Sequence, residues 1–276
     1  MDSLTINEQD IIRTISPNDE MYAGDKAFSD WYWFVGRSAL DAIELCLRAA
    51  RKPLSSVRHI LDLPCGHGRV LRYLKAAFPT SEITVCDLLK DGVEFCAKTF
   101  GAKPVYSDED PKRIELSPHT FDLIWVGSLF THLSAERWPT FLACLGSYLQ
   151  EDGVLVFTTH GRYVYRRMKG LEDPHEYCLP YWRRTVALYD YEHTGFGYGD
   201  YQDKGYGISV ADPGWVCALL GQQRELRCVY FQERGWSDIQ DVYACVRSLR
   251  PRDSEVATPV TLYLKHRLRE RWKPSK

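Results

Sequence analysis

Apolar residues between positions 37 and 160 follow two spacings that alternate along the chain. Spacings of three and four residues predict amphipathic helices over 37–51, 68–78, 91–100 and 134–149. Short apolar runs predict buried strands at 57–63, 83–86, 104–106, 121–126 and 154–159. Strands that alternate regularly with helices are typical of a parallel sheet with right-handed crossovers. The pattern therefore predicts an α/β fold, a Rossmann-like, mostly parallel sheet with helices on both faces.

The second half of the chain breaks this alternation. Residues 161–207 are rich in Tyr, Gly, Arg and His and are too many for an ordinary connection, so we expect a functional insertion or lid. Asp212 and Pro213 then open a helix as N-cap and first helical residue. Apolar runs at 226–231 and 241–246 predict a closing antiparallel pair of strands.

The two ends of the chain differ from this core. Residues 1–30 are polar and predict a loose arm, which the aromatic residues 31–34 follow. Residues 248–276 are basic and predict a solvated tail or an amphipathic helix, packed on its own domain or touching a membrane surface or partner. We thus expect an arm and cap helix over 1–56, a core over 57–247 and a basic tail.

Composition narrows the choice of partners. The chain has 276 residues, of which 45% are hydrophobic, enough for a sizeable core. A formal net charge of −2 gives no general reason to bind nucleic acid, because phosphate contact supplies most of that affinity. Nine cysteines, an odd number without a CxxC pair, suggest buried small side chains in a reducing cytosol. With neither a signal-peptide pattern nor a membrane-spanning run, we expect a cytoplasmic protein, and we expect no metal site.

The turn after the first strand carries the strongest chemical signal. The strand ends near Asp62, and Pro64, Gly66 and Gly68 lead into a helix. Glycines let the backbone approach a ligand, and the helix N-terminus offers free N–H donors to an anion. A dinucleotide fingerprint fits poorly, because its third glycine would fall on Leu71 and Asp62 would repel a pyrophosphate.

Acidic residues follow three successive strands. Asp62 suits an ammonium group, and Asp87, 25 residues later, can accept hydrogen bonds from ribose hydroxyls. Leu88 and Leu89 could flank a purine, and Asp108 after the third strand can accept from an adenine amine. The carboxyl ends of parallel strands share one edge of a sheet, so the three acids predict a nucleoside site there.

On these residues the chain resembles the class I S-adenosylmethionine-dependent methyltransferases over about 57–160. The segment from Ile60 to Gly68 is similar to the first motif of that family, and 121–128 looks like its fourth strand. The resemblance implies a seven-stranded sheet whose last strand is antiparallel, with S-adenosylmethionine as cofactor. It implies cofactor contacts from eight residues: Asp62, Pro64, Gly66, Gly68, Asp87, Leu88, Asp108 and Ser128.

Within that site, the resemblance assigns Asp62 and the glycines to the methionine end, Asp87 to the ribose, Leu88 to the adenine ring and Asp108 to its amine. Pro64 stands where the family more often has glycine. Proline lacks an N–H, which removes one backbone contact.

Two histidines are candidates for a general base. His132 follows the fourth strand and His160 ends the fifth, at the same edge of the sheet. Both could instead be histidines that bond backbone, and for His67 we expect an exposed structural role. The insertion offers an aromatic and polar lining for an acceptor, or a plain aromatic core: Tyr189, Tyr191, Glu192, His193, Phe196, Tyr198, Tyr201 and Tyr206.

We therefore expect methyl transfer to a small-molecule acceptor, with a hydroxyl of a sugar or natural product as the best candidate. Two alternatives remain. One is a methyltransferase fold that binds without turnover, and the other is a dinucleotide-dependent oxidoreductase.

Overall fold

The computed structural model describes residues 4, 6–22, 26–172, 181–201 and 205–248. Its main sheet has seven strands in the order β3-β2-β1-β4-β5-β9-β8. The strands are β1 (His59–Asp62), β2 (Glu82–Asp87), β3 (Lys103–Tyr106), β4 (Phe121–Val126), β5 (Leu149–Thr159), β8 (Leu226–Trp236) and β9 (Gln240–Arg247). The first five strands pair in parallel, and β9 lies antiparallel to both β5 and β8. The predicted sheet, with its antiparallel last strand, is confirmed.

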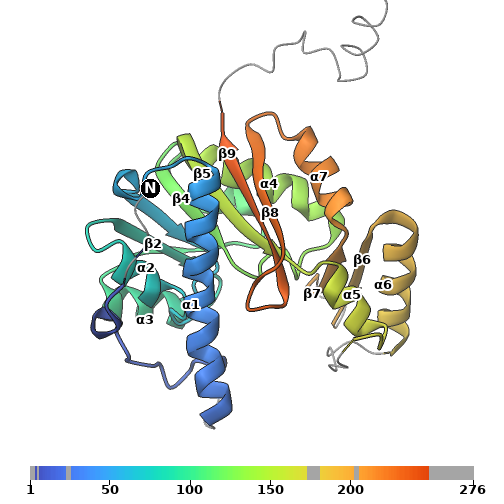
Figure 1. Cartoon of the computed structure of the whole chain (residues 1–276), viewed down its shortest axis with the longest axis horizontal. Helices are drawn as coiled ribbons and strands as arrows, with labels where there is room; N and C mark the ends of the chain where they lie inside the picture. The colour runs from blue at the N-terminus through green and yellow to red at the C-terminus, as the bar shows by residue number, and fades with distance from the viewer. Residues whose placement is uncertain (1–3, 5, 23–25, 173–180, 202–204, 249–276) are drawn as a thin grey trace, which may run out of the picture.

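Helices cover both faces of this sheet (Figure 1). One face packs on α1 (Lys26–Ala49), α2 (Leu71–Ala77) and α3 (Lys90–Phe100), and the other on α4 (Trp138–Tyr148) and α7 (Pro213–Gln222). Alternation along β4 supplies both cores, because Trp125 faces the first layer and Ile124 the second. Strand order reverses between β1 and β4, which is where open α/β sheets bind ligands.

The described residues between 162 and 211 form a smaller unit beside the end of this sheet (Figure 1). It contains α5 (Arg162–Met168), α6 (Tyr181–Thr194) and a two-stranded antiparallel sheet of β6 (Phe196–Asp200) and β7 (Gly207–Ala211). Its small core includes Val164, Tyr191 and Val210. Backbone hydrogen bonds attach β7 to the main sheet's loops: the Ser209 N–H donates to the Thr131 carbonyl and the Ala211 N–H to that of His160, both at 2.8 Å.

Several predicted boundaries were wrong. Helix α1 begins at Lys26 and not at 37, because the aromatic residues 31–34 belong to it. Helix α2 begins at Leu71, since the left-handed backbone of Gly68 keeps the turn open for longer than the apolar spacing suggested. After Ser134 the chain first forms a 3₁₀ turn, Ala135–Arg137, before α4.

The N-terminal arm is less loose than predicted. Tyr32 is fully buried and its hydroxyl donates to Asp19 Oδ2 at 2.8 Å. Arg72 donates to the Ile12 carbonyl at 2.5 Å, so residues of the arm are fixed against α1 and α2. The predicted basic tail, 248–276, lies outside the described residues apart from Ser248. Among the helices of the described residues, none combines the length and apolar character that a membrane crossing requires.

Candidate functional site

Asp62 ends β1 at the point where the strand order reverses. Its side chain is 1% exposed, and neither carboxylate oxygen has a hydrogen-bond partner. Burial raises the pKa of Asp62 well above its ordinary value, and the negative charge of Asp87 raises it further. A buried carboxylate without partners is unfavourable, so this position is suited to a ligand that brings a positively charged donor.

The turn after Asp62 is shaped by two glycines with left-handed backbones. Gly66 has φ +50° and its N–H donates to Asp87 Oδ2 at 2.7 Å. Gly68 has φ +83°, and a Cβ there would lie 2.6 Å from the Phe100 ring. Pro64 is half-buried within the same turn. The turn therefore requires glycine at both positions, for conformation at each and for space at Gly68.

Asp87 joins this turn to the end of β2. Its second oxygen, Oδ1, accepts from the Leu89 N–H at 2.9 Å, so the carboxylate is held in one orientation. Leu88 is 58% exposed and Leu89 56%, which places two large apolar side chains at the open edge of the sheet. Asp108, after β3, is half-buried and accepts from the Asp110 N–H. The structure thus places acids at the ends of three adjacent strands, as predicted from sequence.

His132 lies in the loop after β4, against the smaller unit. Its Nδ1 is 2.7 Å from the Gly207 carbonyl oxygen, which can only accept, so Nδ1 carries the proton and Nε2 the lone pair. Burial lowers the pKa of His132, which keeps the ring neutral. The Tyr206 ring stacks on the imidazole with centroids 4.7 Å apart. These contacts give His132 the tautomer and charge of a general base.

His160 follows β5 and, like His132, bonds to a backbone carbonyl of β7. Its Nδ1 lies 3.2 Å from the Ser209 carbonyl, two residues along β7 from the carbonyl that binds His132. Burial lowers the pKa of His160 to about 3, with a smaller contribution from His132. The structure brings both predicted histidines to β7, with His160 the more deeply buried.

Ser128 is part of a polar network beneath this edge. Its backbone is left-handed, with φ +66°, and its N–H donates to Thr158 Oγ1 at 2.8 Å. Gln240 donates to Ser128 Oγ at 2.7 Å and accepts from Thr158. Sequence reasoning missed Gln240 because no local motif marks it, and only the pairing of β5 with β9 brings it here.

Most aromatic residues of the insertion pack within the protein and do not gather at the histidines. Tyr191 stacks on Tyr165, and Phe196 packs on Trp138 and Trp215. Tyr189 is 60% exposed and stacks on His193 of its own helix. Tyr206 is the predicted lid residue that contacts His132. His67, predicted to be exposed, is buried, and its Nε2 lies 3.0 Å from Asp91 Oδ2.

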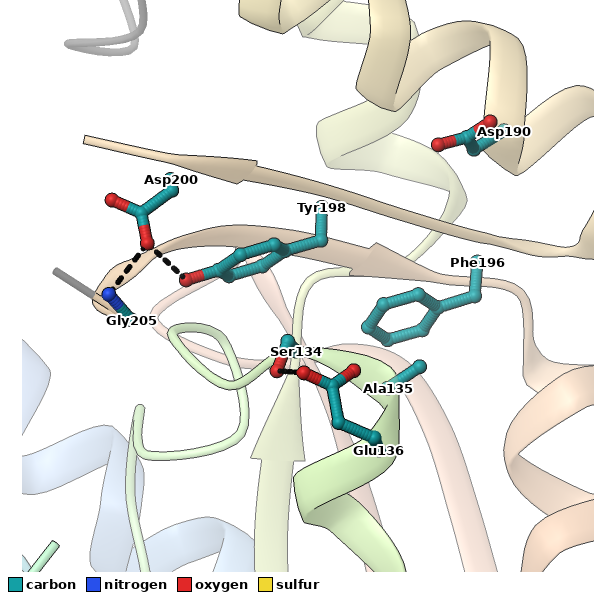
Figure 2. A pocket seen from close by; sticks show the side chains of 8 residues that line it. All are labelled: Ser134, Ala135, Glu136, Asp190, Phe196, Tyr198, Asp200 and Gly205. Carbon is teal, nitrogen blue, oxygen red and sulfur yellow. Dashed lines mark hydrogen bonds between the residues drawn. The ribbon is translucent and has the colours of Figure 1, made fainter. Parts of the chain in front are cut away.

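A pocket of about 400 Å³, shown in Figure 2, is lined by residues other than those of this site. Its lining comes from the 3₁₀ turn before α4, from α6 and from the β6–β7 pair: Ser134, Ala135, Glu136, Asp190, Phe196, Tyr198, Asp200 and Gly205. Neither the strand-end acids nor the two histidines line it. The Asp200 carboxylate already accepts from the Gly205 N–H and the Tyr198 hydroxyl, so we place the candidate site at the edge of the main sheet. Among the described residues, no group of His, Cys, Asp and Glu side chains is arranged to hold a metal ion.

Comparison with known proteins agrees with this geometry. Residues 60–153 match the family model described as a methyltransferase domain. A malonyl-[acyl-carrier protein] O-methyltransferase of Halalkalibacterium halodurans is 28% identical over 161 residues, which are 56% of each protein. A relative of the same name from Anoxybacillus flavithermus is 30% identical over 103 residues, which are 39% of its length. The chain therefore matches about half or less of the curated relatives' length.

Solved structures share the fold at low sequence identity. An S-adenosylmethionine-dependent methyltransferase from Clostridium acetobutylicum is 12% identical, with a TM-score of 0.53 over 77% of this chain and 92% of that one. The Burkholderia thailandensis 1,6-didemethyltoxoflavin-N1-methyltransferase, solved with bound 1,6-didemethyltoxoflavin and S-adenosylhomocysteine, is 14% identical. Its TM-score is 0.52 over 78% of this chain and 80% of that one.

Proposed function

We propose that this chain, whose residues 60–153 match a methyltransferase domain, is a class I S-adenosylmethionine-dependent methyltransferase that methylates a hydroxyl oxygen of a small molecule. The observation that carries the proposal is the unpartnered carboxylate of Asp62, buried at the turn where the strand order reverses. A dinucleotide would bring phosphates to this carboxylate and be repelled. S-adenosylmethionine would bring an ammonium group and be attracted.

The strand ends fit the remaining parts of the cofactor. In this proposal the methionine end binds between Asp62, Pro64 and the Gly66–Gly68 turn, where Asp62 takes the ammonium. Asp87 is fixed by two backbone N–H groups and keeps lone pairs for ribose hydroxyls. The exposed Leu88 would flank the adenine and Asp108 would accept from its amine.

When bound, the cofactor supplies a methyl carbon that bonds to the acceptor oxygen while the carbon–sulfur bond breaks and its electron pair remains on sulfur. The protein positions the acceptor and removes its proton. His132 Nε2 holds the lone pair that receives this proton, because Nδ1–H is committed to the Gly207 carbonyl. His160, held two residues further along β7, is the second candidate for this role. Ser128, held by Gln240 and Thr158, would line the site without taking part in proton transfer.

Oxygen is the acceptor atom that this arrangement favours. A hydroxyl must lose its proton during transfer, and a neutral histidine that stays unprotonated in a buried site suits that step. The curated relatives are named for O-methylation of malonyl-acyl-carrier protein. We propose a hydroxyl of a sugar or natural product for this chain.

The first experiment is isothermal titration with S-adenosylmethionine, followed by mass spectrometry of a panel of small hydroxyl compounds incubated with enzyme and cofactor. We expect binding in the micromolar range, as is common for enzyme substrates, and addition of one methyl group to a panel member. Absence of binding of S-adenosylmethionine and S-adenosylhomocysteine up to about millimolar concentration would contradict the proposal. Binding without transfer to any acceptor would favour a module without turnover.

A further inference from the structure

Tyr206 occupies an unusual position at the tip of the β6–β7 pair. Its ring stacks on His132 at an interplanar angle of 18°, and Tyr201 packs against it in a tilted arrangement at 5.5 Å. The residue nevertheless remains 55% exposed, so part of the ring surface is open. Its environment raises the pKa of the phenol, through partial burial first and the negative charge of Asp87 second. Tyr206 therefore packs directly on the candidate base, and its phenol is within reach of the charge of the acid proposed to bind ribose.

These two neighbours restrict where the reacting atoms can be. This step rests on the proposed function: the ribose is held at Asp87, and the acceptor oxygen gives its proton to His132. A general base must be within about 3 Å of the proton that it removes, and the methyl group must lie between donor sulfur and acceptor oxygen. The sulfonium is thus required between Asp87 and His132, close to the Tyr206 ring that stacks on His132.

We propose that Tyr206 binds the sulfonium of S-adenosylmethionine through the ring surface that His132 and Tyr201 leave open, and so makes the protein prefer the methyl donor over the demethylated product. The electron-rich face of an aromatic ring attracts a cation within about 6 Å, typically by about two- to fivefold in affinity where the ring is partly exposed. S-adenosylhomocysteine has a neutral thioether at the same place and lacks this attraction. Tyr206 acts as a binding residue with charge selectivity, distinct from the ammonium site at Asp62.

The experiment compares dissociation constants for S-adenosylmethionine and S-adenosylhomocysteine, by isothermal titration, in wild type, Tyr206→Phe and Tyr206→Leu. Tyr206→Leu is expected to weaken the methyl donor about three- to fivefold and the product less than about twofold. Tyr206→Phe keeps the ring and is expected to keep the ratio of the two constants close to that of wild type. Partial unfolding of a variant would weaken both apparent dissociation constants by the same factor, so it does not obscure their ratio.

Tyr189→Leu is the matched control, since Tyr189 also stacks on a histidine but lies exposed on α6. It is expected to leave both constants unchanged. Equal weakening of both ligands by Tyr206→Leu, or an unchanged ratio, would overturn the proposed sulfonium contact while leaving the proposed function intact. If wild type binds neither ligand, the proposed function fails, and the role of Tyr206 fails with it.

Discussion

At the scale of the residue, Asp62 combines complete burial with two oxygens that lack partners. Burial without partners makes the ionised carboxylate unfavourable, and this raises the pKa of Asp62. A ligand ammonium would reverse the preference, because it stabilises the ionised form. Cofactor binding would then be coupled to release of a proton.

Asp62→Asn tests this coupling. We expect S-adenosylmethionine affinity to fall about tenfold or more, since a charge-assisted hydrogen bond is replaced by a neutral one. In wild type, affinity should rise as pH increases through the raised pKa of Asp62, and the variant should lose this dependence. Titration in buffers with different ionisation enthalpies measures the proton release. The interpretation fails if the variant releases as many protons as wild type.

His132 gives a second prediction at this scale. His132→Ala should lower kcat about 10²- to 10⁴-fold and change cofactor affinity by less than about threefold. Because burial lowers the pKa of His132, the acidic limb of the wild-type rate profile should lie below the ordinary histidine value of 6.5. The matched control is His193→Ala, since His193 is exposed and bonded within α6. If His132→Ala keeps wild-type turnover, His132 is not the base, and His160 is the next residue to test.

At the scale of the element, β7 is the strand that orients both candidate bases, His132 and His160. Its backbone carbonyls at Gly207 and Ser209 face the same side because strand residues alternate, and each meets one imidazole. The strand is itself backed by β6 and by α6, which packs closely on Gly197. A Cβ at Gly197 would lie 1.9 Å from the Ala187 carbonyl oxygen.

Gly197→Ala should therefore disturb the histidines from a distance. We expect a loss of about 1–3 kcal/mol in the unfolding free energy, as is typical of overpacking, together with a lower kcat. Gly221→Ala on α7 is the control. Apart from its chain neighbours and the backbone of its own helix, no described atom lies within 4 Å of a Cβ added there. The control should stabilise the protein by roughly 0.4–1 kcal/mol. Chemical denaturation and kinetics on the same samples measure both effects, and full activity of Gly197→Ala would contradict the role given to β7.

Elements differ in how far sequence could predict them. The strands were found because each is a short apolar run between turn residues, and Asp62 and Asp87 because they end such runs. The predicted first helix begins 11 residues after the observed one, because only Tyr32 of the aromatic residues 31–34 is buried and the cluster shows no helical spacing. The roles of β7 and Gln240 could not be predicted, because they depend on contacts between segments distant in sequence.

At the scale of the whole molecule, Asp241 lies where the main sheet, the smaller unit and the β8–β9 turn meet. It is fully buried, one oxygen accepts from the Arg234 N–H at 3.0 Å, and the other has no partner. Burial is the main cause that raises the pKa of Asp241 to about 7. An acid whose pKa is raised by folding favours the folded state while protonated. That contribution is lost as pH increases from about 4 through about 7.

Asp241→Asn should remove this pH dependence. The amide of the variant keeps an oxygen that can accept from the Arg234 N–H. The buried hydroxyls of Thr159 and Tyr243 have no hydrogen-bond partner and could bond to the new amide group. Above about pH 7 the variant should be more stable than wild type by about 2–4 kcal/mol, and the difference should shrink toward about pH 4. Urea denaturation across this range measures it. A constant difference at every pH would show that the Asp241 carboxyl does not titrate as expected.

The fold as a whole was predictable because its periodicity is local and its topology follows from right-handed crossovers. For the smaller unit, the sequence predicts only that the strand–helix alternation stops. A stretch rich in Tyr, Gly and Arg does not specify one arrangement of helices and strands. Its aromatic residues suggested an acceptor lining, yet most of them form the contacts that hold the unit together.

The attachment of β7 has an evolutionary consequence. The bonds that join it to the loops at Thr131 and His160, and those that orient both imidazoles, all use main-chain atoms of β7. Such bonds do not depend on the side chains outside β7. On β7 itself replacement is restricted, because all five residues are buried and a Cβ at Gly207 would lie 2.1 Å from the Gly199 carbonyl oxygen. Selection could therefore exchange exposed residues of the insertion outside β7 without changing the main-chain bonds that orient the two candidate bases. Within such a lineage, divergence should concentrate in those exposed positions, while the strand ends proposed to hold the cofactor stay constant.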